Sequence, residues 1–341
     1  MSGQTMIAGA REAHVARTAA PVAFARRHLL DLDDFSAGEL RAVLDAAAEM
    51  RGALDRGVAR LPALQGRTLV NLFYENSTRT RVSFELAAKH LNADVVNVTA
   101  SGSSVAKGES LLDTVRTLEA LGADLVVMRH SQAGAPDLVA RHIAGAVINA
   151  GDGWHAHPSQ ALLDLFTIEE RLGTVAGRRV VIVGDILHSR VARSNLWGLT
   201  AMGAEVVLCG PPTLLPGRIT ELAAARPTPD GKARLVRVET RIERALEGAD
   251  VVMALRLQRE RQAAGLVPSL REYSTRYGLS AARLALARPG AMVMHPGPMN
   301  EGVEIAPDVA HGAASVIERQ VANGVAVRMA VLALLVQART R

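Results

Sequence analysis

Short, continuous runs of β-branched and other apolar residues recur along this 341-residue chain, and segments with helical character separate them. Strands that are apolar at every position are expected where a parallel sheet is buried on both faces. Their alternation with helices indicates βαβ units, and therefore an α/β fold with right-handed crossovers. The predicted strands are Leu69–Phe73, Val95–Val98, Leu125–Met128, Ala146–Asn149, Val180–Val183, Val206–Cys209, Val251–Ala254 and Met292–Met294. The predicted helices include Ser77–Leu91, Glu109–Leu121, Pro158–Arg171, Arg190–Met202, Ser280–Leu286 and Ile317–Leu335.

Length and composition limit the architecture further. A chain of 341 residues exceeds one average domain, so two domains are expected, and its hydrophobic content of 49% is enough for buried cores. No apolar run approaches the roughly 18–20 residues that cross a bilayer, so we predict no membrane association. The single cysteine, Cys209, excludes a disulfide scaffold and indicates a reducing, cytoplasmic location.

The basic residues are almost all arginines. The net charge is +5, yet only three of the 39 basic residues are lysines: Lys89, Lys107 and Lys232. Such an excess usually reflects genome composition, but it also supplies planar guanidinium groups that bind carboxylates and phosphates. Nucleic acid is a weak alternative partner, because aromatic residues make up only 3% of the chain and no basic cluster is interleaved with them. We therefore predict no nucleic-acid binding.

Residues 1–27 differ from the rest of the chain. They are rich in Ala and Arg, and Pro21 interrupts their apolar stretch, Ala19–Ala25. A signal peptide needs a longer apolar centre, whereas a transit peptide has a composition closer to this one. We predict a mobile N-terminal extension, with a targeting sequence as the alternative. The first organised element is expected near Leu30.

The segment Phe73–Arg81 leaves a predicted strand and opens a predicted helix, which Ser77 or Thr78 can cap. Backbone N–H groups, hydroxyls and a guanidinium then converge at the positive end of a helix, an arrangement that binds phosphate. It is not a P-loop, because no glycine-rich turn leads into Gly-Lys-Ser/Thr. A capped helix with surface arginines is the alternative. The predicted buried face of this helix carries Val82, Leu86 and Leu91.

A loop rich in Gly and Ser, Ser101–Ser110, carries Lys107. A mobile lysine can close over an anion as a point charge. Taken alone, the segment is more readily explained as an exposed loop with a solvated lysine.

Polar side chains also follow other predicted strands. Arg129 directly follows Leu125–Met128, and His157 and Gln160, three residues apart, stand at the predicted start of a helix. Ligands of parallel sheets bind at the carboxyl ends of the strands, so these side chains are expected at one site. The pair His155 and His157 does not predict a metal site, since no cysteine or second carboxylate cluster completes one.

The run Val180–Arg190 resembles a dinucleotide-binding turn but contains a single glycine, Gly184, so nicotinamide chemistry is not predicted. Arg190 then remains as a cation at a strand-to-helix junction, and Arg256 follows another strand. The proline-braced loop Met294–Asn300 offers backbone carbonyls that can accept hydrogen bonds from an amide. The strand ends carry no obvious nucleophile or general-base carboxylate. They suit anionic substrates whose reaction needs positioning and charge stabilisation.

Seven of these segments, in this order, resemble the transcarbamoylase family, most closely its branch of aspartate carbamoyltransferase catalytic chains. Each segment alone is a weak signal, but seven in register are specific, and the resemblance covers about residues 28–340. The segments are Ser-Thr-Arg-Thr-Arg at 77–81, Lys-Gly-Glu at 107–109, Met-Arg-His at 128–130, His-Pro-Ser-Gln at 157–160, Gly-Asp-Ile-Leu-His-Ser-Arg at 184–190, Arg-Leu-Gln-Arg-Glu-Arg at 256–261 and His-Pro-Gly-Pro at 295–298.

The resemblance implies a role for each matching residue. The phosphate of carbamoyl phosphate would be held by Ser77, Thr78, Arg79 and Thr80. The carbonyl oxygen would be polarised by Thr80, Arg129 and His157, and the carbamoyl NH₂ would be held by Gln160 and the carbonyls of Gly297 and Pro298. The carboxylates of L-aspartate would be bound by Lys107, Arg190, Arg256 and Gln258. The implied catalytic residues are Arg79, Thr80, Arg129 and His157.

The resemblance also implies the reaction and the assembly. The amine of aspartate would attack the carbonyl, and phosphate would leave, which yields N-carbamoyl-L-aspartate for pyrimidine synthesis without a metal or organic cofactor. A homotrimer would share its active sites, with Ser103 and Lys107 coming from the neighbouring subunit. Residues 28–157 and 315–341 would form a carbamoyl phosphate-binding domain completed by the C-terminal helix, and residues 158–314 an aspartate-binding domain. The extension resembles those of chains that pair, as trimers, with dihydroorotase or an inactive homologue of it.

Two alternatives accompany this interpretation. Ornithine carbamoyltransferases share the phosphate-binding segment, but their pattern has a His-Cys-Leu-Pro loop, and an arginine at 256 would face the ammonium group of ornithine. A catalytically silent phosphate-binding scaffold is the other, although the complete set of polar residues argues against it. Two positions depart from the family pattern: Ser159 stands where threonine is usual, and Glu301 where related chains carry arginine.

Overall fold

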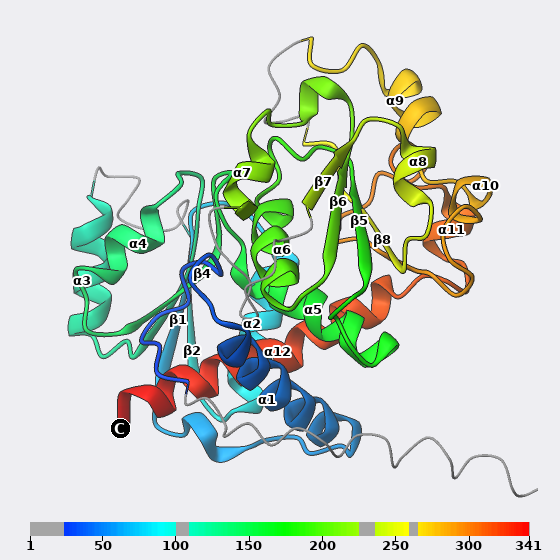
Figure 1. Ribbon diagram of the computed structural model, residues 1–341. Helices are drawn as coiled ribbons and strands as arrows, with labels where there is room; N and C mark the ends of the chain where they lie inside the picture. The colour runs from blue at the N-terminus through cyan, green and yellow to red at the C-terminus, as the bar shows by residue number, and fades with distance from the viewer. Residues whose placement is uncertain (1–23, 100–108, 225–235, 259–264, 341) are drawn as a thin grey trace, which may run out of the picture.

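The computed structural model describes residues 24–99, 109–224, 236–258 and 265–340. It contains two parallel sheets, each flanked by helices, in two lobes (Figure 1). The predicted α/β fold with two sheet domains is therefore confirmed. Most of the predicted extension, residues 1–23, lies outside the described residues.

All neighbouring strands within each sheet are parallel. The first sheet has the order β2-β1-β3-β4 and consists of β1 (Thr68–Phe73), β2 (Asp94–Thr99), β3 (Leu125–His130) and β4 (Ala146–Asp152). The second has the order β7-β6-β5-β8-β9 and consists of β5 (Arg179–Val183), β6 (Glu205–Cys209), β7 (Val236–Glu239), β8 (Val251–Ala254) and β9 (Met292–Met294). The α-helices are α1 (Ala37–Asp55), α2 (Thr78–His90), α3 (Leu111–Ala120), α4 (Ala135–Ala140), α5 (Pro158–Leu172), α6 (Arg190–Ala201), α7 (Ile219–Ala224), α8 (Ile242–Leu246), α9 (Leu270–Tyr277), α10 (Ala281–Leu284), α11 (Pro307–Ala310) and α12 (Ile317–Thr340).

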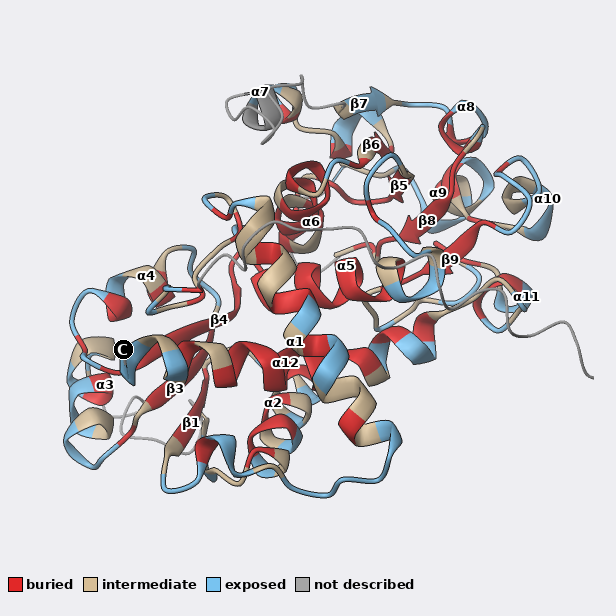
Figure 2. Cartoon of the chain, turned by 60° about the horizontal axis from the view of Figure 1, so that its bottom comes forward, coloured by how far each residue is buried: buried red, intermediate tan, exposed pale blue. Residues whose placement is uncertain are grey.

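Every predicted strand is present, but two of the four edge strands, β7 and β2, depart from the expected pattern. β7 was not predicted, because its sequence Val-Arg-Val-Glu is short and charged and half of it faces solvent. β2 was predicted from an apolar run typical of buried strands, yet half of its residues are exposed. Figure 2 shows β7 as exposed and the inner strands as buried. An edge strand lacks one neighbour, so its sequence does not need the continuous apolar run of a central strand.

The predicted buried face of α2 was wrong at two of its three residues. Val82 and Leu86 are 41% and 43% exposed, whereas Phe84 and Leu91 are fully buried. Both sets of residues have helical spacing, so periodicity alone could not choose between them. The bulky Phe84 ring decides the rotation of the helix, because it packs into the core.

Two long helices form the centre of the molecule. α5 is buried at every position from Pro158 to Ile168, and α12 packs against α1, α2 and α5. Contrary to the sequence expectation, α12 is long and apolar enough to cross a membrane, but 61% of its apolar stretch is buried inside the protein, as in a core helix. These helices contact elements around both sheets, so their packing does not show where one domain ends and the other begins. The predicted domain boundaries therefore stay a prediction.

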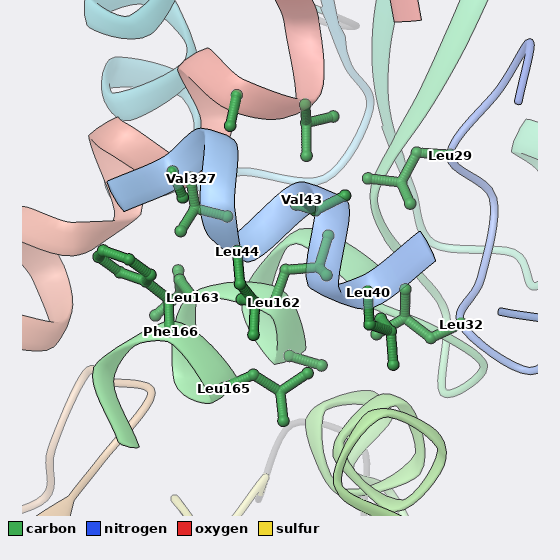
Figure 3. Close-up of a cluster of buried hydrophobic side chains, with 14 of the residues drawn as sticks. Leu29, Leu32, Leu40, Val43, Leu44, Leu162, Leu163, Leu165, Phe166 and Val327 are labelled. Atoms are coloured by element: carbon green, nitrogen blue, oxygen red, sulfur yellow. The ribbon is translucent and has the colours of Figure 1, made fainter. Parts of the chain in front are cut away.

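The largest core cluster joins α1, α5 and α12 (Figure 3). α1, which sequence analysis did not identify, begins with a capping box in which Ser36 Oγ accepts from the backbone N–H of Glu39 and the Glu39 carboxylate accepts from that of Ser36. The apolar face of α1 then packs onto α5. The labelled side chains are Leu29, Leu32, Leu40, Val43, Leu44, Leu162, Leu163, Leu165, Phe166 and Val327.

Truncation of this cluster is expected to destabilise the fold. Leu44 is 1% exposed, so Leu44→Ala should lower the free energy of unfolding by about 2–5 kcal/mol through lost burial and a residual cavity. Leu121, which is 78% exposed, provides the control, since Leu121→Ala should change stability by no more than about 0.5 kcal/mol. Denaturant titration followed by circular dichroism measures both, and equal effects of the two variants would contradict the packing described.

Candidate active site

A cleft of about 840 Å³ opens where the carboxyl ends of the strands of the two sheets approach each other. Its walls come from the β1–α2 junction, the end of β3, the starts of α5 and α6, the segments after β8 and β9, and one face of α12. The polar and charged lining residues are Glu75, Asn76, Ser77, Thr78, Arg79, Thr80, Ser83, Arg129, His157, Gln160, Ser189, Arg190, Arg256, Gln258, His295, Gln320 and Arg328.

Every predicted site residue that the structure describes lines this cleft, including Gly297 and Pro298. The two that were assigned to a neighbouring subunit, Ser103 and Lys107, lie outside the described residues, as do residues 259–261 of the predicted motif. The structure thus brings distant segments together at one place. The individual role of each residue stays a prediction.

At the β1–α2 junction, the helix begins with a capping residue, as the sequence predicts. Ser77 caps α2, and its Oγ accepts a hydrogen bond of 3.4 Å from the backbone N–H of Thr80. Arg79 projects against Gly297, whose φ of +65° and closeness exclude a side chain, since a Cβ there would lie 2.0 Å from Arg79 Nη1. Burial, and then the charge of Arg256, lower the pKa of Arg79. No carboxylate among the described residues pairs with Arg79, so this end of the cleft favours an anion.

Glu75 joins two of the predicted arginines and was not itself predicted. Its Oε1 lies 2.6 Å from Nη2 of Arg129 and 2.6 Å from Nη2 of Arg190, and its Oε2 accepts from Nη1 of Arg190 at 3.1 Å. Arg129 lies on β3 of the first sheet and Arg190 begins α6, which follows β5 of the second sheet, so this carboxylate links segments from both lobes. Gly151 makes room for both, because a Cβ at this position would lie 2.9 Å from Arg190 Cζ and 3.1 Å from Arg129 Nη1. One feature of the sequence could have identified Glu75: it is the one acidic residue of the segment Phe73–Arg81.

His157 is held neutral by its surroundings. It is the N-cap residue of α5, and its backbone N–H donates to Ser194 Oγ at 2.9 Å. Burial first, and then the charges of Arg129, Arg190 and Arg328, hold the pKa of His157 well below its usual range. A neutral imidazole N–H can donate a hydrogen bond to a developing oxyanion without transferring its proton.

Arg328 is a second functional candidate that sequence analysis missed. It lines the cleft from α12, is 4% exposed, and its Nη1 donates to the carbonyl of Gly324 at 2.9 Å. Its guanidinium lies 5.0 Å from the centre of the Phe84 ring. Burial lowers the pKa of Arg328 to about 10, opposed by the charge of Asp164. One feature of the sequence could have identified Arg328: it is the one charged residue within the apolar run 325–336.

The loop after β9 is ordered by His295. Its Nδ1 accepts from the backbone N–H of Gly297 at 2.8 Å, and its Nε2 lies 3.3 Å from the carboxylate of Glu304. Glu301, the departure from the family pattern, does not line the cleft. It is paired instead with His311 at 3.2 Å on the protein surface. The reversed charge therefore acts outside the cleft.

The two histidines considered as a metal pair, His155 and His157, have separate surroundings. His155 does not act together with His157 but pairs with the carboxylate of Asp152 at 3.0 Å. Within the described ranges, no group of three or more His, Cys, Asp or Glu residues is arranged to hold a metal ion. The chemistry available in the described lining is that of cations, hydroxyls, amides, the imidazoles of His157 and His295, and the carboxylate of Glu75.

Five guanidinium groups and one carboxylate line the described part of the cleft. Together with two parallel sheets that meet at their carboxyl ends, they define an enzyme class that binds a phosphorylated acyl donor and an anionic acceptor and stabilises the charge of group transfer. Two family models match the chain: aspartate/ornithine carbamoyltransferase, carbamoyl-P binding domain, over residues 27–170, and its Asp/Orn binding domain over residues 176–335. The chain belongs to the aspartate/ornithine carbamoyltransferase family.

Relatives and solved structures agree with this assignment. The chain is 61% identical over 307 residues to the aspartate carbamoyltransferase catalytic subunit of Roseiflexus sp. (strain RS-1), covering 90% of this chain and 94% of the relative. It is 56% identical to that of Moorella thermoacetica, covering 91% and 97%. Its fold resembles ornithine carbamoyltransferase from Pyrococcus furiosus (30% identity, TM-score 0.82, 92% and 98% covered). It also resembles aspartate transcarbamoylase from Trypanosoma cruzi in complex with carbamoyl phosphate and aspartate (32%, 0.81, 92% and 96%).

The bridging carboxylate generates a prediction. In Glu75→Gln, Arg129 and Arg190 lose the charge that holds them together, so kcat/KM for the amino-acid substrate should fall by at least about tenfold, the cost of one charge-assisted hydrogen bond. Steady-state kinetics measures the change.

Glu243→Gln is the matched control, because Glu243 forms an ion pair of 3.0 Å with Arg283 away from the cleft. Its kinetic constants should stay close to those of the unmodified chain. Unchanged kinetics in Glu75→Gln would remove the bridge from the working site.

Proposed function

We propose that this chain transfers the carbamoyl group of carbamoyl phosphate to the amine of L-aspartate. The products are N-carbamoyl-L-aspartate and phosphate, in the first committed step of de novo pyrimidine biosynthesis. The observation that carries the proposal is the convergence of arginines from both sheets on one cleft, where Glu75 is the one acidic residue in the described lining. Such a site attracts two anionic substrates and stabilises the negative charge that develops between them.

The cleft suggests how its residues divide the work. The start of α2, with Ser77–Thr80, binds the phosphate of the donor, and Arg129 and His157 donate to its carbonyl oxygen. Arg190 and Arg256 bind the carboxylates of aspartate. The amine of aspartate then forms a bond to the carbonyl carbon, and the tetrahedral oxyanion collapses as the C–O bond to phosphate breaks. The leaving phosphate takes the proton that the amine loses, so the step needs no separate base.

Ornithine is the second candidate acceptor, because one similar structure is an ornithine carbamoyltransferase. Its side-chain ammonium needs an acidic partner, but Glu75 is already engaged by Arg129 and Arg190. Arg256, which lines the same cleft, repels a cation. The names of the relatives that are 61% identical also favour aspartate.

Direct assay tests the proposal. Purified protein with carbamoyl phosphate is expected to form a ureido product with aspartate and none with ornithine, measured colorimetrically and by mass spectrometry. Product with ornithine alone would overturn the acceptor assignment. No product with either would favour the silent scaffold.

We further propose that the chain works as a homotrimer with shared active sites. Val82 and Leu86 on α2 and Val96 on the edge strand β2 are each more than 40% exposed, and Glu85 of α2 accepts from Asn97 of β2 at 3.1 Å. An apolar face of this kind is typical of a contact between subunits. In this proposal Ser103 and Lys107, which lie outside the described residues, come from the neighbouring subunit.

Subunit complementation tests this arrangement. Lys107→Ala and Arg79→Ala chains should each be nearly inactive alone. In an equal, randomised mixture about a quarter of the sites should regain both residues from different chains, and activity should return to that extent. Mass photometry and exchange of labelled subunits verify mixing. Verified exchange without restored activity would contradict shared sites.

Three further assignments complete the proposal. The single cysteine, Cys209, is buried and free, which fits a reducing cytoplasm. Paired trimers with dihydroorotase, or an inactive homologue of it, are proposed from the N-terminal extension. The native mass of the protein isolated from its own cells tests that partnership, and a trimer alone with full activity would count against it. The function is proposed to need no metal or organic cofactor.

A further inference from the structure

Asp164 lies one helical turn after Gln160 on α5 and is fully buried. Its carboxylate accepts hydrogen bonds from three side-chain amides on three different helices. Oδ1 accepts from Nε2 of Gln160 at 3.0 Å and from Nε2 of Gln320 at 2.6 Å, and Oδ2 accepts from Nδ2 of Asn195 at 2.7 Å. Of these four residues, Gln160 and Gln320 line the cleft, and Asp164 and Asn195 lie behind it.

The chemistry of the carboxylate decides how Gln160 is oriented. A primary amide can present either its oxygen or its NH₂ group to a ligand. Here Oδ1 of Asp164 accepts from the NH₂ groups of both Gln160 and Gln320, so the NH₂ group of Gln160 is turned towards Asp164 and its Oε1 is left for the cleft. An oxygen at that place accepts from an NH₂ group on the ligand and offers nothing to a methyl group.

We propose that Asp164 is a positioning residue that fixes the amide of Gln160 and thereby selects carbamoyl phosphate over acyl phosphates that lack the NH₂ group. This inference rests on the proposed function. It adds a cause for donor specificity in a residue that does not touch the substrate.

The same carboxylate also supports the loop after β9. Gln320 gives its NH₂ group to Asp164, so its Oε1 is free to accept from the backbone N–H of His295 at 3.1 Å. His295 begins the loop that presents the carbonyls of Gly297 and Pro298. The predicted acceptors of the carbamoyl NH₂ group are Gln160 and the carbonyls of Gly297 and Pro298. Gln160 is bonded to Asp164 directly, and the loop that carries the two carbonyls is connected to Asp164 through the side chain of Gln320.

The burial of Asp164 has a cost that its partners oppose. Burial raises its pKa to about 7, while the amides of Asn195, Gln320 and Gln160 and the charge of Arg328 act in the opposite direction. Asp164 is 0% exposed, and burying an ionisable side chain costs folding free energy that an apolar side chain at the same place would not cost. The polarity that it imposes on the surrounding amides gives a reason for its presence.

Acetyl phosphate is the probe for the experiment, because it has a methyl group where carbamoyl phosphate has NH₂. The KM for carbamoyl phosphate and the Ki values for acetyl phosphate and inorganic phosphate are measured at saturating aspartate. In Asp164→Leu and the smaller Asp164→Ala, the KM for carbamoyl phosphate should rise about tenfold, as for one lost hydrogen bond, while both Ki values change less than about threefold.

Two matched variants separate this role from a structural one. Asp164→Asn should restore discrimination, since its Oδ1 can accept from both glutamines. Its NH₂ group would replace Oδ2, which now accepts from Nδ2 of Asn195, and it can donate to Oδ1 of Asn195 once that amide turns over, because this Oδ1 has no partner in the described structure. Asn195→Ala removes a bond to Asp164 Oδ2 and leaves Gln160 held, so it should lower thermal stability without changing the ratio of Ki for acetyl phosphate to KM.

The outcomes are distinct. A common rise of all three constants in Asp164→Leu, or no rise, overturns the inference, as does a wild-type chain that binds both acyl phosphates equally. If the Asp164 variants do not fold, Gln160→Met decides, because retained wild-type discrimination in that variant excludes Gln160 as the selecting group. If the wild-type chain forms no carbamoyl aspartate, the proposed function is wrong. The role of Asp164 can then still be tested by calorimetric competition between the two acyl phosphates.

Discussion

The repulsion between like charges is the constraint on which this structure depends. Guanidinium groups from both sheets and from α12 are held around one cleft, and a single carboxylate, Glu75, lies among them in the described lining. Groups of the same sign do not gather unless a rigid scaffold prevents their separation. Here the chain makes room for the guanidinium groups with glycines: Arg79 lies beside Gly297, and Arg129 and Arg190 lie beside Gly151, where a Cβ would come within about 3 Å of them. The excess of positive charge is what a pair of anionic substrates neutralises.

Two largely buried helices position the groups that line the cleft. α5 begins at the cleft with His157 and Gln160, and α12 passes beside it with Gln320 and Arg328. Both belong to the largest core cluster, so a shift of either would disturb packing over much of the molecule. Polar groups that face the cleft are therefore placed by an apolar interior. This explains why precise orientation, such as that of the Gln160 amide, can be set by a residue behind the cleft.

The same positive field sets the chemistry of the histidine. Burial and three neighbouring arginines lower the pKa of His157, which favours the neutral imidazole, a form that can donate a hydrogen bond. The arginines thus have two effects, as ligands of anions and as the cause of the protonation state of their neighbour. A site of this kind needs no nucleophile, because its work is to align two substrates and stabilise charge.

The sequence by itself determined the sheets and the segments that end at the cleft. Continuous apolar runs identify inner strands, since a strand buried on both faces tolerates little else, and the short motifs after them carry local signals such as the capping Ser77. Only the tertiary structure decided which face of α2 is buried, that β2 and β7 are edges, and that Glu75, Arg328 and Asp164 belong to the site. The physical reason is that these properties arise between segments far apart in the chain: Glu75 acquires its role from Arg129 and Arg190, and Asp164 from amides on three helices. Local pattern records what a residue does for its own helix or strand, and not which partner the fold brings to it.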